Sequence, residues 1–252
     1  MTEAVGYAAS AVAAAHVFVD RIDDDSDLWV EGDDGHHLQR VRRLRAGESI
    51  TASDGHGSWR VCTIAEVGEG RLRLTPTGPL MIEPVLAPRL VVAFAPAKGD
   101  SAGAVVHQLV ELGVDAVMLI TLARSAVRWD GARGDRPRAR LGRVIREAAM
   151  QSRRSQIPVL LDAVPLADLA GNPGLIVGDP AGEPAAAMEL PAGEEWIVLV
   201  GPEGGLDPAE RELVAAAAHL AVGPHVLRAV TAPVAAAAAL AGLRRPLTPD
   251  SQ

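Results

Sequence analysis

The sequence predicts a two-part α/β protein, in which a small β-barrel precedes an open parallel α/β sheet. Short strand-like segments fill the first third of the 252 residues, whereas apolar strands alternate with helical segments afterwards. Between the two patterns, Pro76, Pro79, Pro84 and Pro88 interrupt any regular element. We therefore expect a linker near residues 76–88.

The first part contains four strand-like segments, over residues 17–19, 49–52, 59–65 and 71–75. Residues 54–57 read Asp-Gly-His-Gly, which is typical of a tight turn. Short strands joined by such turns predict a small β-barrel. The single cysteine, Cys62, lies within the third segment, so no disulfide can form within the chain, and we expect a buried small hydrophobe.

The second part alternates buried strands, over residues 90–95, 116–121, 175–178 and 196–200, with helices over residues 101–112 and 137–150. Gly113 follows the first helix as a terminator should. This alternation predicts a parallel sheet that binds a ligand at the carboxyl ends of its strands. The turn after the first strand lacks the glycine patterns of dinucleotide-binding and P-loop proteins, which disfavours both classes.

Two glycine-proline loops near the C-terminus each follow an apolar segment and precede a helix. They occupy residues 201–205, Gly-Pro-Glu-Gly-Gly, and residues 223–228, Gly-Pro-His-Val-Leu-Arg. Glycines allow the backbone to approach a ligand closely, and a helix start offers unpaired N–H groups. The two loops therefore predict a nucleotide-like pocket.

The helix after the first loop has a well-marked start. Asp207 can cap it, Pro208 suits its first position, and Glu210 completes the spacing of a capping box. The start after the second loop is weaker, with Thr231 as the cap and Pro233 in the first turn. We expect both helices to begin beside the pocket.

The charge distribution is segregated, although the net charge is −8. Eight acidic residues lie within residues 20–34, Arg40, Arg42, Arg43 and Arg45 follow, and residues 133–154 hold eight arginines against two acidic residues. Arginine binds phosphate bidentately, so both basic blocks could contact a nucleic-acid backbone. The alternative is a solvated helix face. No apolar run reaches membrane-spanning length, and we expect no metal site at His36 and His37.

An ordered series of motifs resembles the RsmE-type ribosomal RNA methyltransferases. It comprises the two glycine-proline loops with Glu210, and upstream Lys98-Gly99, Glu111-Leu112-Gly113-Val114, Arg124-Ser125 and residues 147–158. Residues 37–44, Gly47-Glu48 and Asp54-Gly55 resemble the family's RNA-binding barrel. The resemblance covers about residues 16–245.

The resemblance implies a PUA-like RNA-binding β-barrel over residues 16–80 and a SPOUT α/β methyltransferase domain with a trefoil knot over residues 87–246. It implies a homodimer that uses S-adenosylmethionine, without a metal, to methylate uridine N3 in small-subunit (16S) ribosomal RNA. The single cysteine suits a reducing cytoplasm, so we expect a cytoplasmic protein. Ribosomal RNA or the assembled subunit would be the partner, and no membrane is involved. A SPOUT enzyme that methylates ribose 2′-hydroxyls and a catalytically weak RNA-binding factor are the alternatives.

The same resemblance assigns the cofactor site to residues that end two strands or form the two loops. These are Val177, Gly178, Val200, Gly201, Pro202, Glu203, Gly204, Gly205, Val222, Gly223, Val226 and Leu227. Asp179, which follows the first of these strands, belongs to the same side of the predicted pocket.

Methylation of uridine N3 requires loss of a proton, which a base or a cation that stabilises the anion can assist. The predicted catalytic residues are Arg228, Glu203 and Thr231, with Arg228 on the anion or a phosphate and Thr231 on the base. Glu203 could instead cap loop amides, and Arg228 could pair with Glu203 or a dimer partner. Val230 stands where the family often has glutamate. The predicted RNA-binding residues are Arg40, Arg42, Arg43, Lys98, Arg124, Arg153 and Arg154.

Overall fold

The computed structural model divides the chain into two compact units. The first combines Met1–Pro84 with Ala149–Ile157, and the second combines Val85–Ala148 with Pro158–Gln252. The structure describes residues 13–22, 25–32, 35, 44–68, 70–97, 101–127 and 132–247. No helix in these ranges has the length and apolar character needed to cross a membrane.

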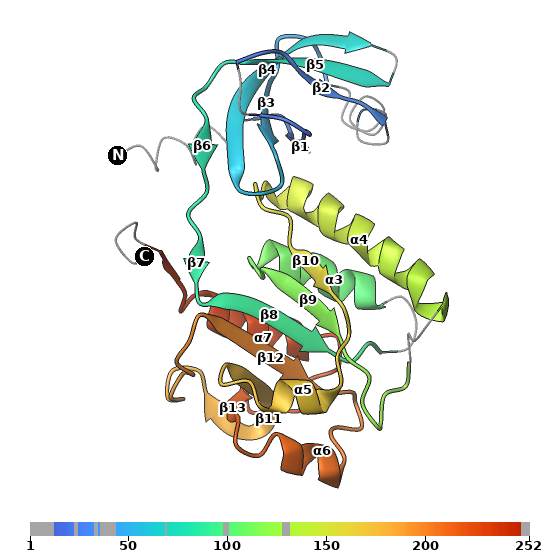
Figure 1. The fold of residues 1–252 in the computed structure, drawn as a ribbon, viewed down its shortest axis with the longest axis vertical. Helices are drawn as coiled ribbons and strands as arrows, with labels where there is room; N and C mark the ends of the chain where they lie inside the picture. Colours follow the sequence, from blue (N-terminus) through green and yellow to red (C-terminus); the bar gives the residue numbers. More distant parts are fainter. Residues whose placement is uncertain are drawn as a thin grey trace. The chain divides into compact units, whose positions relative to one another are not determined.

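The first unit contains a six-stranded sheet (Figure 1). Its strands are β1 (His16–Phe18), β2 (Leu28–Val30), β3 (Ser49–Ser53), β4 (Ser58–Gly68), β5 (Arg71–Pro76) and β6 (Met81–Ile82). The order is β1-β3-β4-β5-β2, with β6 also paired to β4, and only β1 and β3 run parallel. The four predicted strands are confirmed, whereas β2 and β6 were missed because two or three residues cannot show a reliable alternation.

Alternating residues of these strands form one core. Ile50, Cys62, Ile64, Leu72 and Leu74 are each fully buried in it. Burial raises the pKa of the Cys62 thiol to about 11, so the thiol stays protonated and packs as a small hydrophobe, as predicted.

The tight turn predicted between β3 and β4 is present. The Asp54 carboxylate accepts hydrogen bonds from the backbone N–H groups of His56, at 2.7 Å, and Ser58, at 3.1 Å. Gly55 has a φ of 78°, a conformation that suits glycine. Local hydrogen bonding therefore fixes this turn.

The second unit is built on six parallel strands. They are β8 (Arg89–Phe94), β9 (Ala116–Leu119), β10 (Val159–Leu161), β11 (Leu175–Pro184), β12 (Glu195–Val200) and β13 (Ala218–Ala221). The order is β10-β9-β8-β12-β11-β13, and every adjacent pair is parallel. The predicted open parallel sheet is thereby confirmed. On one side of β8 the chain adds β9 and then β10, whereas on the other side β12 lies between β8 and β11, and β13 is outermost. In open parallel sheets a ligand binds at the carboxyl ends of the strands.

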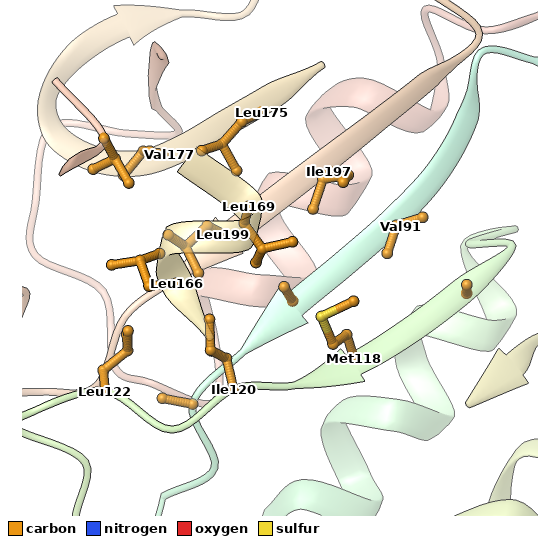
Figure 2. Packing of buried hydrophobic residues seen from close by; sticks show 14 residues of the cluster. Val91, Met118, Ile120, Leu122, Leu166, Leu169, Leu175, Val177, Ile197 and Leu199 are labelled. Atoms are coloured by element: carbon orange, nitrogen blue, oxygen red, sulfur yellow. The ribbon is translucent and has the colours of Figure 1, made fainter. Parts of the chain in front are cut away.

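Helices cover both faces of this sheet (Figure 1). They are α3 (Ser101–Glu111), α4 (Ala132–Ser152), α5 (Leu166–Ala170), α6 (Pro208–Leu213) and α7 (Ala232–Ala241). On one face α7 packs on β8, β11 and β12 and also contacts α3. On the other face Leu166 and Leu169 of α5 pack on Val91, Ile197 and Leu199 (Figure 2). Burial of both faces explains the continuous apolar runs of these strands.

Three details differ from the sequence prediction. The helix α4 begins at Ala132, five residues before the predicted start, so Pro137 lies inside the helix instead of at its first position. The short elements β10 and α5 were not predicted. The predicted linker contains β6 and β7 (Leu86–Ala87), and β7 pairs with β14 (Arg245–Pro246). The trefoil knot stays a prediction.

Candidate functional site

A cavity of about 190 Å³ is lined by residues 177–180 within β11, by the segments that follow β12 and β13, and by the start of α7. Eleven of the twelve residues predicted to bind a cofactor line it, and Gly204 is the exception. Apolar side chains of Leu206, Leu220 and Ala236 complete the wall. The carboxyl ends of the parallel strands thus form the concave site that the sheet topology favours.

The first glycine loop is a tight turn. The Gly205 N–H donates to the Pro202 carbonyl at 2.8 Å, and Gly205 has a φ of 66°, which a side chain disfavours. The capping box of α6 is confirmed, because the Glu210 N–H donates to the Asp207 carboxylate at 2.8 Å and the Asp207 N–H donates to the Glu210 carboxylate at 2.9 Å. The loop therefore enters α6 with a fixed backbone.

A second segment, residues 122–125, is fastened to this loop. The Ala123 N–H donates to Oε1 of Glu210 at 2.7 Å, and the Arg124 guanidinium donates to the Gly204 carbonyl at 2.7 Å. A Cβ atom at Gly204 would lie 3.3 Å from Arg124 Cβ. Gly204 therefore faces Arg124 and not the cavity. No sequence pattern predicts this contact, because 80 residues separate the partners.

The second loop leads into α7 through Arg228. The Arg228 carbonyl accepts hydrogen bonds from the N–H groups of Thr231, at 2.8 Å, and Ala232, at 2.9 Å. Its side chain is exposed, between Leu227 and Ala229, which both line the cavity. Among the described residues, no ion pair joins Arg228 to Glu203, which is an exposed residue of the cavity lining.

The third predicted catalytic residue, Thr231, lies elsewhere. It precedes α7 without a side-chain capping bond and lines a groove between α3 and α7, together with Val230, Val105, Leu112 and others. The residue that departs from the resemblance, Val230, therefore belongs to this apolar groove.

Asp179 adds a carboxylate to the cavity. Its Oδ1 accepts from the Ala181 N–H at 2.8 Å, and its Oδ2 lies 3.0 Å from Nδ1 of His219. The hydrogen bond from the Ala181 N–H, followed by that of His219, lowers the pKa of Asp179 below its ordinary value. The carboxylate is thus ionised near neutral pH.

The predicted RNA-binding residues are distributed over several segments. Arg40, Arg42, Arg43 and Lys98 lie outside the described residues. Arg153 and Arg154 belong to the first unit, where the Arg153 guanidinium donates to the Ala13 carbonyl at 2.7 Å. Both arginines are half-buried.

Comparison with known proteins identifies the family. Residues 85–241 match the model of an RNA methyltransferase domain, and residues 30–77 match that of an RNA methyltransferase PUA domain. A ribosomal RNA small subunit methyltransferase E of Mycobacterium bovis is 34% identical over 235 residues, which cover 88% of this chain and 89% of the relative. The chain belongs to the RsmE family of RNA methyltransferases.

Other RsmE proteins extend the match. The Bacillus subtilis protein is 26% identical over 87% of this chain and 91% of its own length. The crystal structure of the Neisseria gonorrhoeae protein bound to S-adenosyl methionine superposes with a TM-score of 0.77 at 26% identity, covering 91% of this chain and 97% of that chain. The fold is therefore a PUA domain combined with a SPOUT methyltransferase domain of the RsmE kind.

Proposed function

We propose that this RsmE-family protein transfers a methyl group from S-adenosylmethionine to N3 of a uridine in small-subunit ribosomal RNA. The observation that carries the proposal is the cavity formed by the two glycine-proline loops and residues 177–180 of β11. The relatives' names support the substrate, and the Neisseria gonorrhoeae structure supports the cofactor.

The cavity lining fits S-adenosylmethionine chemically. Val200, Leu220 and Leu227 offer apolar surface for a purine, and the glycine loops allow close backbone contact. The Asp179 carboxylate offers a hydrogen-bond acceptor. When bound, the cofactor supplies a methyl group already activated on a sulfonium, so the chain needs no metal. Within the described part of the chain, no cluster of three His, Cys, Asp or Glu residues could hold one.

The protein's share of the chemistry is to orient the uracil and to favour its N3 anion. Arg228 is exposed beside the cavity, where its guanidinium can stabilise negative charge on the base or bind a phosphate. Glu203, on the lining, is the second charged group at the opening and can accept a proton or cap loop amides. Thr231 lies on the groove between α3 and α7, so we leave it out of the reaction centre.

The RNA contacts follow the domain division. We assign RNA binding to a PUA-like barrel over residues 16–80 and methyl transfer to a SPOUT domain over residues 87–246. Arg153 and Arg154 are added to the first unit by a segment from outside that range. With Arg40, Arg42, Arg43 and Lys98 they would track the RNA backbone, whereas Arg124 also fastens the cofactor loop through the Gly204 carbonyl.

The groove between α3 and α7 supports a homodimer. Its lining is mostly Ala, Val and Leu, and Val230 on it is 36% exposed. Apolar surface of this kind is typical of an interface between subunits. We place the dimer in the cytoplasm, where ribosomal subunits are its substrate.

The test measures transfer of labelled methyl to small ribosomal subunits that lack the modification, followed by mass spectrometry of the nucleosides. We expect 3-methyluridine. Label in a ribose would replace the proposal by 2′-O-methylation, and cofactor binding without transfer to RNA or to subunits would identify a non-catalytic RNA-binding factor.

A matched pair of variants tests the role of Arg228. Removing a group that stabilises transition-state charge typically costs a hundred-fold or more in turnover, and we expect a loss on the order of that for Arg228→Ala. Arg245→Ala removes another exposed arginine, in β14, and should leave turnover unchanged. Equal turnover in the two variants would remove Arg228 from the reaction centre.

A further inference from the structure

The Asp179 carboxylate in the cavity has no assigned partner group on the cofactor. Asp179 lines the cavity and keeps 37% of its side chain exposed, while two protein groups hold it. Since a carboxylate oxygen has two lone pairs, each oxygen of Asp179 retains one for a further donor after binding Ala181 N–H and His219.

We propose that Asp179 binds the ribose hydroxyls of S-adenosylmethionine and that His219 positions it for that contact. The inference rests on the proposed function, because it concerns the cofactor of the same cavity. Asp179 would then be a cofactor-binding residue and His219 a positioning residue.

The backbone places Asp179 at the cavity by leaving the sheet. Gly178 of β11 pairs with Leu220 of β13, and Glu183 pairs with the same Leu220. The four residues 179–182 therefore form an excursion from the ladder. The Ala181 N–H closes this excursion onto the Asp179 carboxylate, which follows Val177, the last residue of β11 that pairs with β12.

The neighbouring strand holds His219 close to Asp179. A Cβ atom at Gly182 would lie 2.4 Å from the His219 carbonyl oxygen and 2.9 Å from the Leu220 nitrogen. These are backbone atoms, which cannot rotate away. Only glycine permits this approach of the two segments, and the approach keeps the His219 ring within hydrogen-bonding reach of the carboxylate.

The surroundings favour ribose hydroxyls as the donors. In dinucleotide-binding parallel sheets, an acidic residue near the glycine-rich loop hydrogen-bonds a ribose hydroxyl, and Asp179 offers the same group beside a glycine-rich loop here. Asp179 follows the segment of β11 that pairs with β12, and β12 leads into the loop at Gly201. The other carboxylate of the lining, Glu203, is exposed and has no side-chain partner among the described residues.

An acceptor already fixed by hydrogen bonds loses little entropy when it binds a ligand. The hydrogen bond from the Ala181 N–H also lowers the pKa of Asp179, so the acceptor is charged under assay conditions. Hydrogen bonds to a charged group are stronger than neutral ones.

Calorimetry with the full-length protein tests the contact. Asp179→Asn keeps an oxygen for the Ala181 N–H but removes the charge. We expect it to weaken binding of S-adenosylmethionine by about ten- to a hundred-fold. The same loss is expected with 5′-methylthioadenosine, which keeps the ribose and lacks the methionine tail. Removing the 2′-hydroxyl from this probe should abolish most of the difference between wild type and variant.

Three results would overturn the assignment. A loss with S-adenosylmethionine but not with 5′-methylthioadenosine would place the carboxylate on the ammonium of the methionine tail. Unchanged binding of both ligands would make Asp179 only the closure of its turn. If Asp179→Asn fails to fold, the wild type decides alone, since equal binding of 5′-methylthioadenosine and its 2′-deoxy form excludes the contact.

Variants of His219 test its positioning role. His219→Leu should weaken binding several-fold, and His219→Asn, whose amide can donate near the Nδ1 position, should restore most of the affinity. A structural role alone would show no such rescue. Gly182→Ala should reproduce the loss of His219→Leu, and the double variant should add little to it. Full affinity in Gly182→Ala would contradict the mechanism.

Failure of the inference and of the proposed function can be told apart. A wild-type protein that does not bind S-adenosylmethionine contradicts the proposed function. Normal wild-type binding that is insensitive to these variants contradicts only the inference.

Discussion

The protein should lose stability between pH 7 and pH 4 because of one buried histidine in the first unit. His16 is 5% exposed, and its ring nitrogens lie 2.8 Å from Thr51 Oγ1 and 3.2 Å from Ser53 Oγ. Burial lowers its pKa from 6.5 to about 4. A backbone hydrogen bond with Arg154 opposes this shift, and the charge of Arg153 adds a smaller lowering. The imidazole is therefore neutral in the folded protein.

The direction of the effect follows from the two pKa values. Above pH 6.5 the ring is neutral in both states and contributes nothing to the pH dependence. As the pH falls from 6.5 towards 4, the unfolded chain binds a proton that the folded protein does not, so the free energy of unfolding decreases. At about 1.4 kcal/mol per pKa unit, the loss is about 2 kcal/mol at pH 5 and about 3 kcal/mol at pH 4.

Urea denaturation at pH 7.5, 6.5, 5.5 and 5.0 measures this loss, followed by tryptophan fluorescence, to which Trp29 and Trp59 of the first unit contribute. The control is His16→Asn, whose amide can bond Thr51 but cannot titrate. We expect the variant to be less stable at pH 7.5 by about 1–2 kcal/mol and to lose about 2 kcal/mol less than wild type on going to pH 5. Equal losses in the two proteins would refute the reasoning.

Three further predictions concern the second unit. Gly205→Ala forces a side chain onto a backbone φ of 66°, which costs about 1–2 kcal/mol, so calorimetry should show about ten-fold weaker S-adenosylmethionine binding. The control is Gly242→Ala, which has open space and a φ of −71° and should bind the cofactor normally. Glu210→Ala removes the acceptor for the backbone N–H groups of Ala123 and Asp207, so thermal unfolding should show a loss of stability of about 1–2 kcal/mol, with partial recovery in Glu210→Gln. An unchanged Tm would contradict this role of Glu210. Arg244 is buried and donates hydrogen bonds to three carbonyls and to Asp115. Urea denaturation should show that Arg244→Met lowers the free energy of unfolding by about 3–5 kcal/mol and that adding Asp115→Asn recovers part of this loss.

Much of the fold could be predicted because its signals are local. The parallel strands read as apolar runs, α3 ends at a glycine, and the capping box of α6 needs only residues three apart. Most of the shortest strands, β2, β6, β7, β10 and β14, were not predicted, since two or three residues carry little periodicity and form strands only where a neighbour supplies hydrogen bonds. The three-residue strand β1 is the exception.

The candidate site was likewise predictable only where its sequence signals are local. Glycine and proline spacing identified both loops, and eleven of the twelve residues that the family resemblance assigned to the cofactor site line one cavity. Which residue of the first loop faces the cavity could not be predicted, since Gly204 and Gly205 are neighbours in the sequence and only Gly205 lines the cavity. In the folded loop the Gly205 N–H bonds the Pro202 carbonyl, whereas the Gly204 carbonyl accepts from Arg124.

The sequence by itself determined the two-part architecture, the parallel sheet, the helix starts and the pair of glycine-proline loops, because each depends on residues within a few positions of one another. Only the tertiary structure decided that Arg124 fastens the first loop and that His219 holds Asp179, across 80 and 40 residues. Such contacts follow from strand order and register, and the packing of the whole sheet fixes both.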